Sequence, residues 1–187
     1  GHRVSKAQLE RNEKGATFVP VWRKLGVSFD STVSYAFAAI YGRGRGLYRR
    51  AMQFELDSRL ASDTFVLGDM LLSRVLLMND SRFPWLIIVP RRPNLREILD
   101  LASTERAILM EEIAKVSGAL RDCTKAEKLN VAALGNVVAQ LHVHVVARFA
   151  DDAAWPHPVW GRSHPARYED AAAAQFSAEI GRKLGFI

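Results

Sequence analysis

The sequence predicts an α+β fold in which helices pack on one antiparallel sheet. Three observations predict it: short apolar segments bounded by turn residues, two longer segments with helical periodicity, and an alternation of strand pairs with helices. Residues 52–187 carry this pattern and are interpreted as one domain, which is an ordinary size for a single core. Residues 1–51 differ in character and are interpreted as an extension.

The first elements of the domain are expected to be strands. Residues 64–67 and 71–78 are apolar segments, the second rich in leucine and valine. The sequence NDSRFP has turn chemistry, and residues 85–89 form a further apolar strand that Pro90 ends. These segments predict an antiparallel hairpin.

Two segments show the periodicity of amphipathic helices, and two more strands lie between them. Residues 104–123 and 169–184 are the predicted helices, and residues 131–134 and 137–147 are the predicted strands, separated by Gly135. The apolar positions of the helices recur every three or four residues: Leu109, Ile113, Val116, Leu120 and Cys123 in the first, and Phe176, Ile180 and Leu184 in the second.

Composition excludes several classes of protein. The one cysteine, Cys123, excludes an internal disulfide and a cysteine-rich zinc module, and its place on a buried helical stripe indicates a structural thiol. No run approaches eighteen apolar residues, so we expect no membrane span and no membrane partner. With no secretory signal pattern at the N-terminus, the expected location is the cytoplasm.

The net charge of +6 comes from the first quarter of the chain. Residues 1–51 hold ten Lys and Arg against three Asp and Glu, and include the sequence GRGRGLYRR. Glycine interleaved with arginine disfavours regular structure, so we interpret this segment as a basic extension that is flexible or loosely docked. A contact with nucleic acid is conceivable only through these basic residues.

Two of the five histidines occur within the sequence QLHVHVV, at residues 140–146. Side chains alternate between faces along a strand, so Gln140, His142 and His144 are expected on one face, in steps of about 6.6–6.8 Å. The intervening Leu141, Val143 and Val145 are expected on the other face, in the core.

Three interpretations of the two histidines remain open at this point. They could be half-buried packing residues. They could be two ligands of a metal, although the further ligands would have to be His157, His164 or distant carboxylates, with no zinc-like spacing. They could also serve nucleophilic catalysis, since a neutral imidazole attacks phosphorus readily and a protonated neighbour can stabilise charge.

The sequence QLHVHVV resembles the motif of the histidine-triad superfamily, in which histidines alternate with hydrophobic residues. The sequences FELDSRLASDT, LLMND, WLIIVPRR, LNVAALGNVVAQLHVHVVAR and WPHPVWG are similar to the bacterial branch described as hydrolases of diadenosine polyphosphates. The resemblance covers residues 52–187 in the family's order and implies a histidine-triad fold and a homodimer.

The resemblance also implies roles for the motif. His142 occupies the middle position, whose ring attacks the α-phosphorus and forms a nucleotidyl-histidine intermediate that water hydrolyses. His144 occupies the third position and contacts the phosphate oxygens. Gln140 replaces a histidine at the first position; its amide can orient a neighbour but cannot titrate.

The nucleotide-binding residues implied by the resemblance lie outside the motif. Asn79 corresponds to a residue that binds ribose hydroxyls, and Leu77 lines the base pocket. Asn136 corresponds to an amide residue near the phosphate, and the backbone N–H of Val138 to a phosphate donor, whereas Asn130 lies on the approach to the motif. Turn capping is the alternative interpretation of the asparagines.

These residues together predict a hydrolase or transferase that cleaves a phosphoanhydride or phosphoramidate at the α-phosphate of a purine nucleotide conjugate, such as a dinucleoside polyphosphate. No cofactor is required by this chemistry, although Mg²⁺ could accompany the substrate. Trp155 and Trp160 resemble the C-terminal rim of the family's site, with plain packing as the alternative. The alternative functions are a nucleotide-binding sensor or scaffold with little turnover, and a metal-dependent hydrolase.

Overall fold

The computed structural model describes residues 54–162 and 164–187. Predictions about residues 1–51, including their contact with nucleic acid, lie outside the described residues. The described part is an α+β fold: five antiparallel strands form one sheet in the order β1-β2-β3-β5-β4. The strands are β1 (Thr64–Asp69), β2 (Ser73–Met78), β3 (Trp85–Pro90), β4 (Lys128–Ala132) and β5 (Val143–Arg148).

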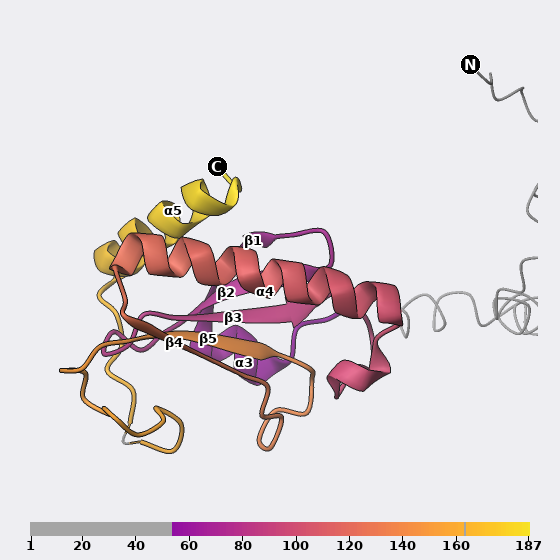
Figure 1. Ribbon diagram of the computed structural model, residues 1–187, viewed down its shortest axis with the longest axis horizontal. Helices are drawn as coiled ribbons and strands as arrows, with labels where there is room; N and C mark the ends of the chain where they lie inside the picture. Colours follow the sequence, from indigo (N-terminus) through magenta and orange to yellow (C-terminus); the bar gives the residue numbers. More distant parts are fainter. Residues whose placement is uncertain (1–53, 163) are drawn as a thin grey trace, which may run out of the picture. The chain divides into compact units, whose positions relative to one another are not determined.

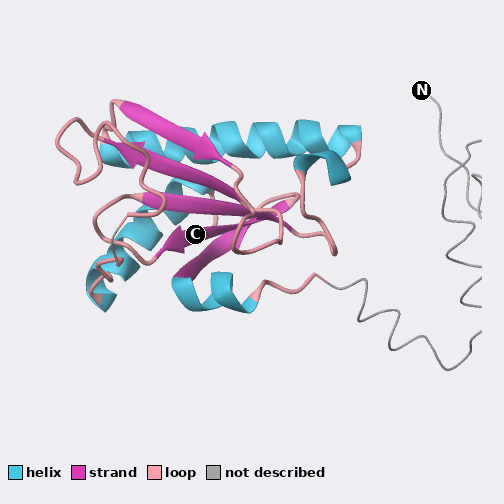
Figure 2. Cartoon of the chain, turned by 90° about the horizontal axis from the view of Figure 1, so that it is seen from below, coloured by secondary structure: helices cyan, strands magenta, loops and turns pink. Residues whose placement is uncertain are grey.

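Two long helices cover one face of the sheet, and a short helix lies against the other (Figures 1 and 2). The long helices are α4 (Ser103–Thr124) and α5 (Asp170–Leu184), and the short ones are α3 (Ser58–Asp63) and the 3₁₀ turn η2 (Ile98–Asp100). Helix α4 ends in the left-handed conformation at Lys125, and α5 ends at Gly185, where a positive φ suits glycine.

We call the side of the sheet under α4 and α5 the helix face and the other side the histidine face. On the helix face, α4 and α5 pack on alternate residues of the inner strands. These residues form a continuous core that includes Val75, Leu77, Leu86, Ile88, Val116, Leu120, Val143, Val145 and Ile180. A second, smaller cluster on the histidine face joins Leu60 of α3 to Leu76, Trp85, Ile87 and Val146.

The predicted elements are largely present, but the strand predicted at residues 137–147 begins only at Val143. Before it, the main chain finds partners outside the sheet ladder: the Val137 carbonyl accepts from Arg59 Nη1 at 2.8 Å, and Leu141 N donates to the Leu95 carbonyl at 2.9 Å. Residues 133–142 are therefore an irregular connection. The strand predicted at residues 131–134 is displaced to Lys128–Ala132.

Helix α3 was absent from the predicted elements. It has six residues, and only Leu60 is buried, so it lacks a readable apolar period. Its start is fixed by Asp57, whose side chain accepts a hydrogen bond from Arg59 N at 2.9 Å. The segment before it matters for the site, because it binds the side chain of Gln140.

Candidate functional site

His142 and His144 lie on the same face of the chain, as the alternation predicts. Their ring centroids are 4.7 Å apart and the ring planes are nearly perpendicular, at 82°. Both side chains are buried, with 6% and 7% of their surface exposed. The intervening Val143 points to the helix face and belongs to the main core. Two imidazoles are therefore held side by side on the face that neither long helix covers.

The ring of His142 is bound through one nitrogen to its own main chain. Its Nδ1 lies 2.6 Å from the carbonyl oxygen of Gln140. A carbonyl oxygen only accepts hydrogen bonds, so Nδ1 carries the proton. In the neutral ring, Nε2 then holds the lone pair, and His142 presents a nucleophilic nitrogen.

The ring of His144 has the opposite arrangement. The indole N–H of Trp85 donates to His144 Nδ1 at 3.0 Å, and an indole N–H can only donate. Nδ1 therefore holds a lone pair, and the proton of the neutral ring is on Nε2. Burial, followed by the neighbouring charge that His142 can carry, lowers the pKa of His144 to about 3. A protonated neighbour, which one interpretation of the sequence uses to stabilise charge, is therefore disfavoured at this buried position in the free protein.

The side chain of Gln140 points to the segment before α3. Its Nε2 donates to the Glu55 carbonyl at 2.8 Å, and its Oε1 accepts from Asp57 N at 2.9 Å. Only its main-chain carbonyl contacts His142. Gln140 therefore orients His142 through its main-chain carbonyl. Its side-chain amide hydrogen-bonds residues 55–57 to the motif.

Two residues predicted to bind the nucleoside lie near the end of β2. Asn79 accepts a hydrogen bond from Tyr168 N on its Oδ1, at 2.9 Å. Leu77 is fully buried in the core of the helix face, so it cannot line a pocket beside the histidines. Strand alternation explains the error, because Leu76 is the neighbour that faces the histidine side.

The residues predicted near the phosphate lie in the connection before β5. Asn136 is exposed, and Val138 is half-buried against the cluster on the histidine face. Gly135 precedes them with a φ of 72°, a conformation that favours glycine. Both residues lie a few positions before the two histidines, and their contact with a phosphate stays a prediction.

Asn130 belongs to a buried polar network rather than to a turn. Its Oδ1 accepts from Arg148 Nη1 at 2.6 Å, and Arg148 also pairs with Asp152 at 2.7 Å and donates to the His157 carbonyl at 2.9 Å. Arg148 is only 2% exposed. The network fixes the chain that follows β5, and Asn130 is committed to it.

Two tryptophans border the histidines, and Trp85 was missed by the sequence analysis. Trp160 contacts His144 edge-on at 5.6 Å between centroids and Trp85 at 5.9 Å. No other described residue accepts a hydrogen bond from the buried Nε1 of Trp160. Trp155 is 42% exposed, and its ring lies 5.7 Å from the guanidinium carbon of Arg148. A tryptophan in an apolar strand gave no signal of contact with a histidine far along the chain.

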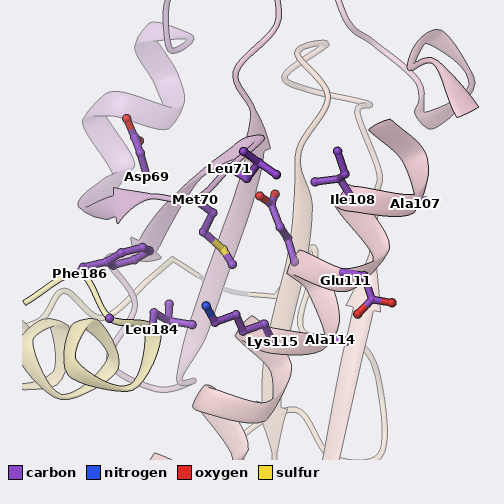
Figure 3. Close-up of a pocket in the computed structure, with 12 residues that line it drawn as sticks. Asp69, Met70, Leu71, Ala107, Ile108, Glu111, Ala114, Lys115, Leu184 and Phe186 are labelled. Atoms are coloured by element: carbon purple, nitrogen blue, oxygen red, sulfur yellow. The ribbon is translucent and has the colours of Figure 1, made fainter. Parts of the chain in front are cut away.

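A hollow with a volume of about 860 Å³ lies away from this constellation (Figure 3). It is lined by the β1–β2 turn, one side of α4 and the end of α5, including Leu71, Ile108, Lys115 and Phe186. Neither histidine lines it. The hollow belongs to the helix face, so we do not place the histidine chemistry there.

Within residues 54–162 and 164–187, no three His, Cys, Asp or Glu side chains are grouped in a way that could hold a metal ion. His157 and His164 are both exposed and do not join the pair. In the same residues, no helix combines the length and apolar character needed to cross a bilayer.

Comparison with known proteins identifies the family. Residues 59–151 match the HIT domain. A histidine triad protein from Bradyrhizobium japonicum shares 49% identity, with coverage of 71% of this chain and 98% of that one and a TM-score of 0.69. The chain belongs to the histidine triad (HIT) family.

Two further solved structures agree. A histidine triad protein from Marinobacter aquaeolei VT8 shares 42% identity over 72% of this chain and 98% of its own, with a TM-score of 0.70. One from Sinorhizobium meliloti 1021 shares 42% identity over 70% and 96%, with a TM-score of 0.68. No curated protein matches the chain.

Proposed function

We propose that this protein is a nucleotide hydrolase or nucleotidyl transferase that cleaves a purine nucleotide conjugate at its α-phosphate. The observation that carries the proposal is the opposite hydrogen bonding of Nδ1 in the two adjacent rings: Nδ1 of His142 faces a carbonyl acceptor, and Nδ1 of His144 faces an indole donor. His142 offers a lone pair on Nε2, and His144 offers an N–H at the same position of its ring. A nucleophile beside a hydrogen-bond donor is the pair that transfer at phosphorus needs.

In the proposed reaction, Nε2 of His142 attacks the α-phosphorus and forms a P–N bond while the bond to the leaving group breaks. The leaving group departs with its electron pair and takes up a proton. Water then attacks the nucleotidyl-histidine, the P–N bond breaks, and a nucleoside monophosphate and the free ring result. One displacement is divided into two easier ones, and positioning supplies much of the rate.

His144 contributes as a neutral donor. Because its pKa is about 3, its Nε2–H is present across the physiological range without proton uptake. It can donate to a phosphate oxygen as charge develops there, in surroundings from which water is largely excluded. Asn136 and the N–H of Val138 are proposed to add contacts to the phosphate, and the NH₂ group of Asn79 to meet a ribose hydroxyl.

A nucleotide sensor or scaffold remains the alternative. Gln140 favours this alternative. Its amide is hydrogen-bonded to the main chain of Glu55 and Asp57, and it supplies no titrating group to the reaction. The small exposed fractions of His142 and His144 also favour slow turnover, since the substrate must displace neighbouring side chains to reach them.

A homodimer is part of the proposal. Strand β4 forms one edge of the sheet, and Val131 on it is 48% exposed. Leu134, just beyond the strand, is 44% exposed. An unpaired edge beside exposed apolar side chains favours association with a second copy. Light scattering coupled to gel filtration should give twice the mass of the chain, and Val131→Lys should lower it to that of a monomer.

Turnover distinguishes the candidate functions. The protein would be incubated with diadenosine tetraphosphate and with an adenosine phosphoramidate, with and without chelator, beside His142→Ala. We expect turnover of the phosphoramidate that tolerates chelator and disappears in the variant; this substrate has one phosphate and little need of Mg²⁺. Tight binding without turnover would support the sensor. Activity lost on chelation and restored by metal would support the metal-dependent hydrolase.

A further inference from the structure

The first residue of β3 contacts the site from a neighbouring strand. Trp85 pairs with Val146 of β5, two residues beyond His144, so the indole and the imidazole come from adjacent strands. The ring centroids are 5.3 Å apart, and Trp85 is 7% exposed. The contact is a buried, directed hydrogen bond, from the indole N–H to His144 Nδ1, and not packing alone.

We propose that Trp85 is a positioning residue of the HIT site, whose indole N–H fixes His144 as the neutral ring with its proton on Nε2. The effect of Trp85 on catalysis rests on the proposed function. Its effect on the proton of His144 concerns the protein without substrate and can be tested independently. An indole N–H cannot accept a hydrogen bond, so a proton on Nδ1 of His144 would place two donors against each other. Both the other neutral form and the cation carry that proton, so Trp85 disfavours both.

The remaining surroundings of His144 do not replace this contact. Its partners in the sheet, Ile87 and Ala132, carry no charge, and His142 is the titratable group in contact with its ring. Trp160 touches the ring by its edge, but the structure gives its Nε1 no acceptor among the described residues. Removal of the Trp85 N–H would therefore leave Nδ1 without a donor from its packed neighbours.

The consequence for the reaction is geometric. With Nδ1 held by Trp85, the proton of the neutral ring is on Nε2, the nitrogen that the indole does not contact, where the proposed reaction uses it. Without the bond, the ring can rotate or exchange its proton between nitrogens, and the donor is absent for part of the time. Errors of about 1 Å in a positioned group can cost on the order of 10²-fold in rate. We expect a smaller loss of rate than this when only the orientation of one hydrogen-bond donor is lost.

The test compares Trp85→Phe, which keeps an aromatic ring and removes the N–H, with Trp160→Phe as the matched control. Nitrogen NMR of histidine-labelled protein reports which nitrogen of His144 carries the proton, with His144→Asn to assign the signals. We expect an Nε2–H form in the native protein and in Trp160→Phe between pH 5 and 8. In Trp85→Phe we expect a mixture of the two neutral forms, with the proton on Nδ1 in part of the molecules, because the N–H that opposed this form is gone.

The kinetic arm measures the phosphoramidate reaction. We expect Trp85→Phe to lower kcat about 10-fold with little change in KM. An unchanged His144 signal in folded Trp85→Phe would overturn the proposal even if turnover persisted. A changed signal with no turnover in any variant would support Trp85 as the positioning residue and would refute the proposed hydrolase. If Trp85→Phe does not fold, Trp85→Leu, which also lacks a hydrogen-bond donor, gives the comparison.

Discussion

The two faces of the chain along residues 141–146, the first four residues of β5 and the two residues before it, differ in what their side chains do. On the helix face, Leu141, Val143 and Val145 are apolar, and they are buried against α4 and α5. On the histidine face, His142 and His144 are buried too, but each is held by a directed hydrogen bond. Because alternate residues of one chain serve the two faces, a substitution at one position should affect stability and at the next position chemistry.

The largest expected effect is on kcat, and it distinguishes the neighbouring residues His142 and Leu141, which lie on opposite faces. His142→Ala removes the nucleophile, and we expect a fall in kcat of at least about 10³-fold with a small change in melting temperature. Leu141→Ala should lower the free energy of unfolding by about 3 kcal/mol through loss of buried area and a cavity, with kcat of the folded protein nearly kept. Urea unfolding and turnover of both variants measure the contrast. Equal losses of activity would remove the distinction between the faces.

The histidine face also contributes to stability at Arg148, and this sharpens the comparison. Asp152→Ala leaves a guanidinium that is 2% exposed without its carboxylate, so we expect a loss of about 3–5 kcal/mol. Asp69→Ala, which breaks a partly exposed pair with Arg74, should cost at most about 1 kcal/mol. Urea unfolding midpoints give both values. A cost of 1 kcal/mol or less for Asp152→Ala would mean that the network is not a stabilising unit.

A smaller effect concerns pH. The pKa of His144 is about 3 in the folded protein and near 6.5 when unfolded, so the unfolded chain takes up a proton first as the pH falls. This contribution to stability is complete above pH 6.5 and declines towards pH 3. Between pH 7.5 and pH 5 the loss is about 2 kcal/mol. In His144→Asn, the free energy of unfolding should fall by about 2 kcal/mol less between pH 7.5 and pH 5 than in the native protein. An equal fall in both proteins would contradict the buried neutral ring.

The smallest effect is expected at Gln140. Gln140→Ala removes two hydrogen bonds to the main chain of Glu55 and Asp57, which should cost about 1 kcal/mol of unfolding free energy. The contact to His142 uses the carbonyl oxygen and is retained, so kcat should fall less than 10-fold. Urea unfolding and measurement of kcat with the folded variant check these two values. A loss approaching that of His142→Ala would show that the amide itself acts on the substrate.

The apolar pattern of the sequence predicted those helices and strands whose periodicity is complete within the element itself. The long helix α4 and the apolar strands β2 and β3 have periods that sequence displays directly. The side-by-side histidines followed from strand alternation alone. The sequence did not show where β5 begins, because the main-chain partners of residues 137–142 are contributed by Arg59 and Leu95.

The site was predicted where its residues are adjacent in sequence and missed where the fold brings distant ones together. Trp85 lies 59 residues before His144, and nothing in an apolar strand marks its indole as a hydrogen-bond donor to the motif. Leu77 was predicted to line the base pocket, but it is buried in the core of the helix face, and Leu76 belongs to the cluster on the histidine face. Asn130 was interpreted as a binding or capping residue, whereas its partner Arg148 becomes visible only when β4 pairs with β5.

The covalent intermediate on His142 is the most direct test of the account. The protein would be mixed with an adenosine phosphoramidate, quenched within one turnover at alkaline pH to preserve a P–N bond, and digested for mass spectrometry. We predict that the peptide containing His142 gains the mass of one adenylyl group, that the gain decays as product forms, and that His142→Ala shows none. Turnover without this adduct, or with an adduct on another residue, would contradict the assignment of His142 as the nucleophile.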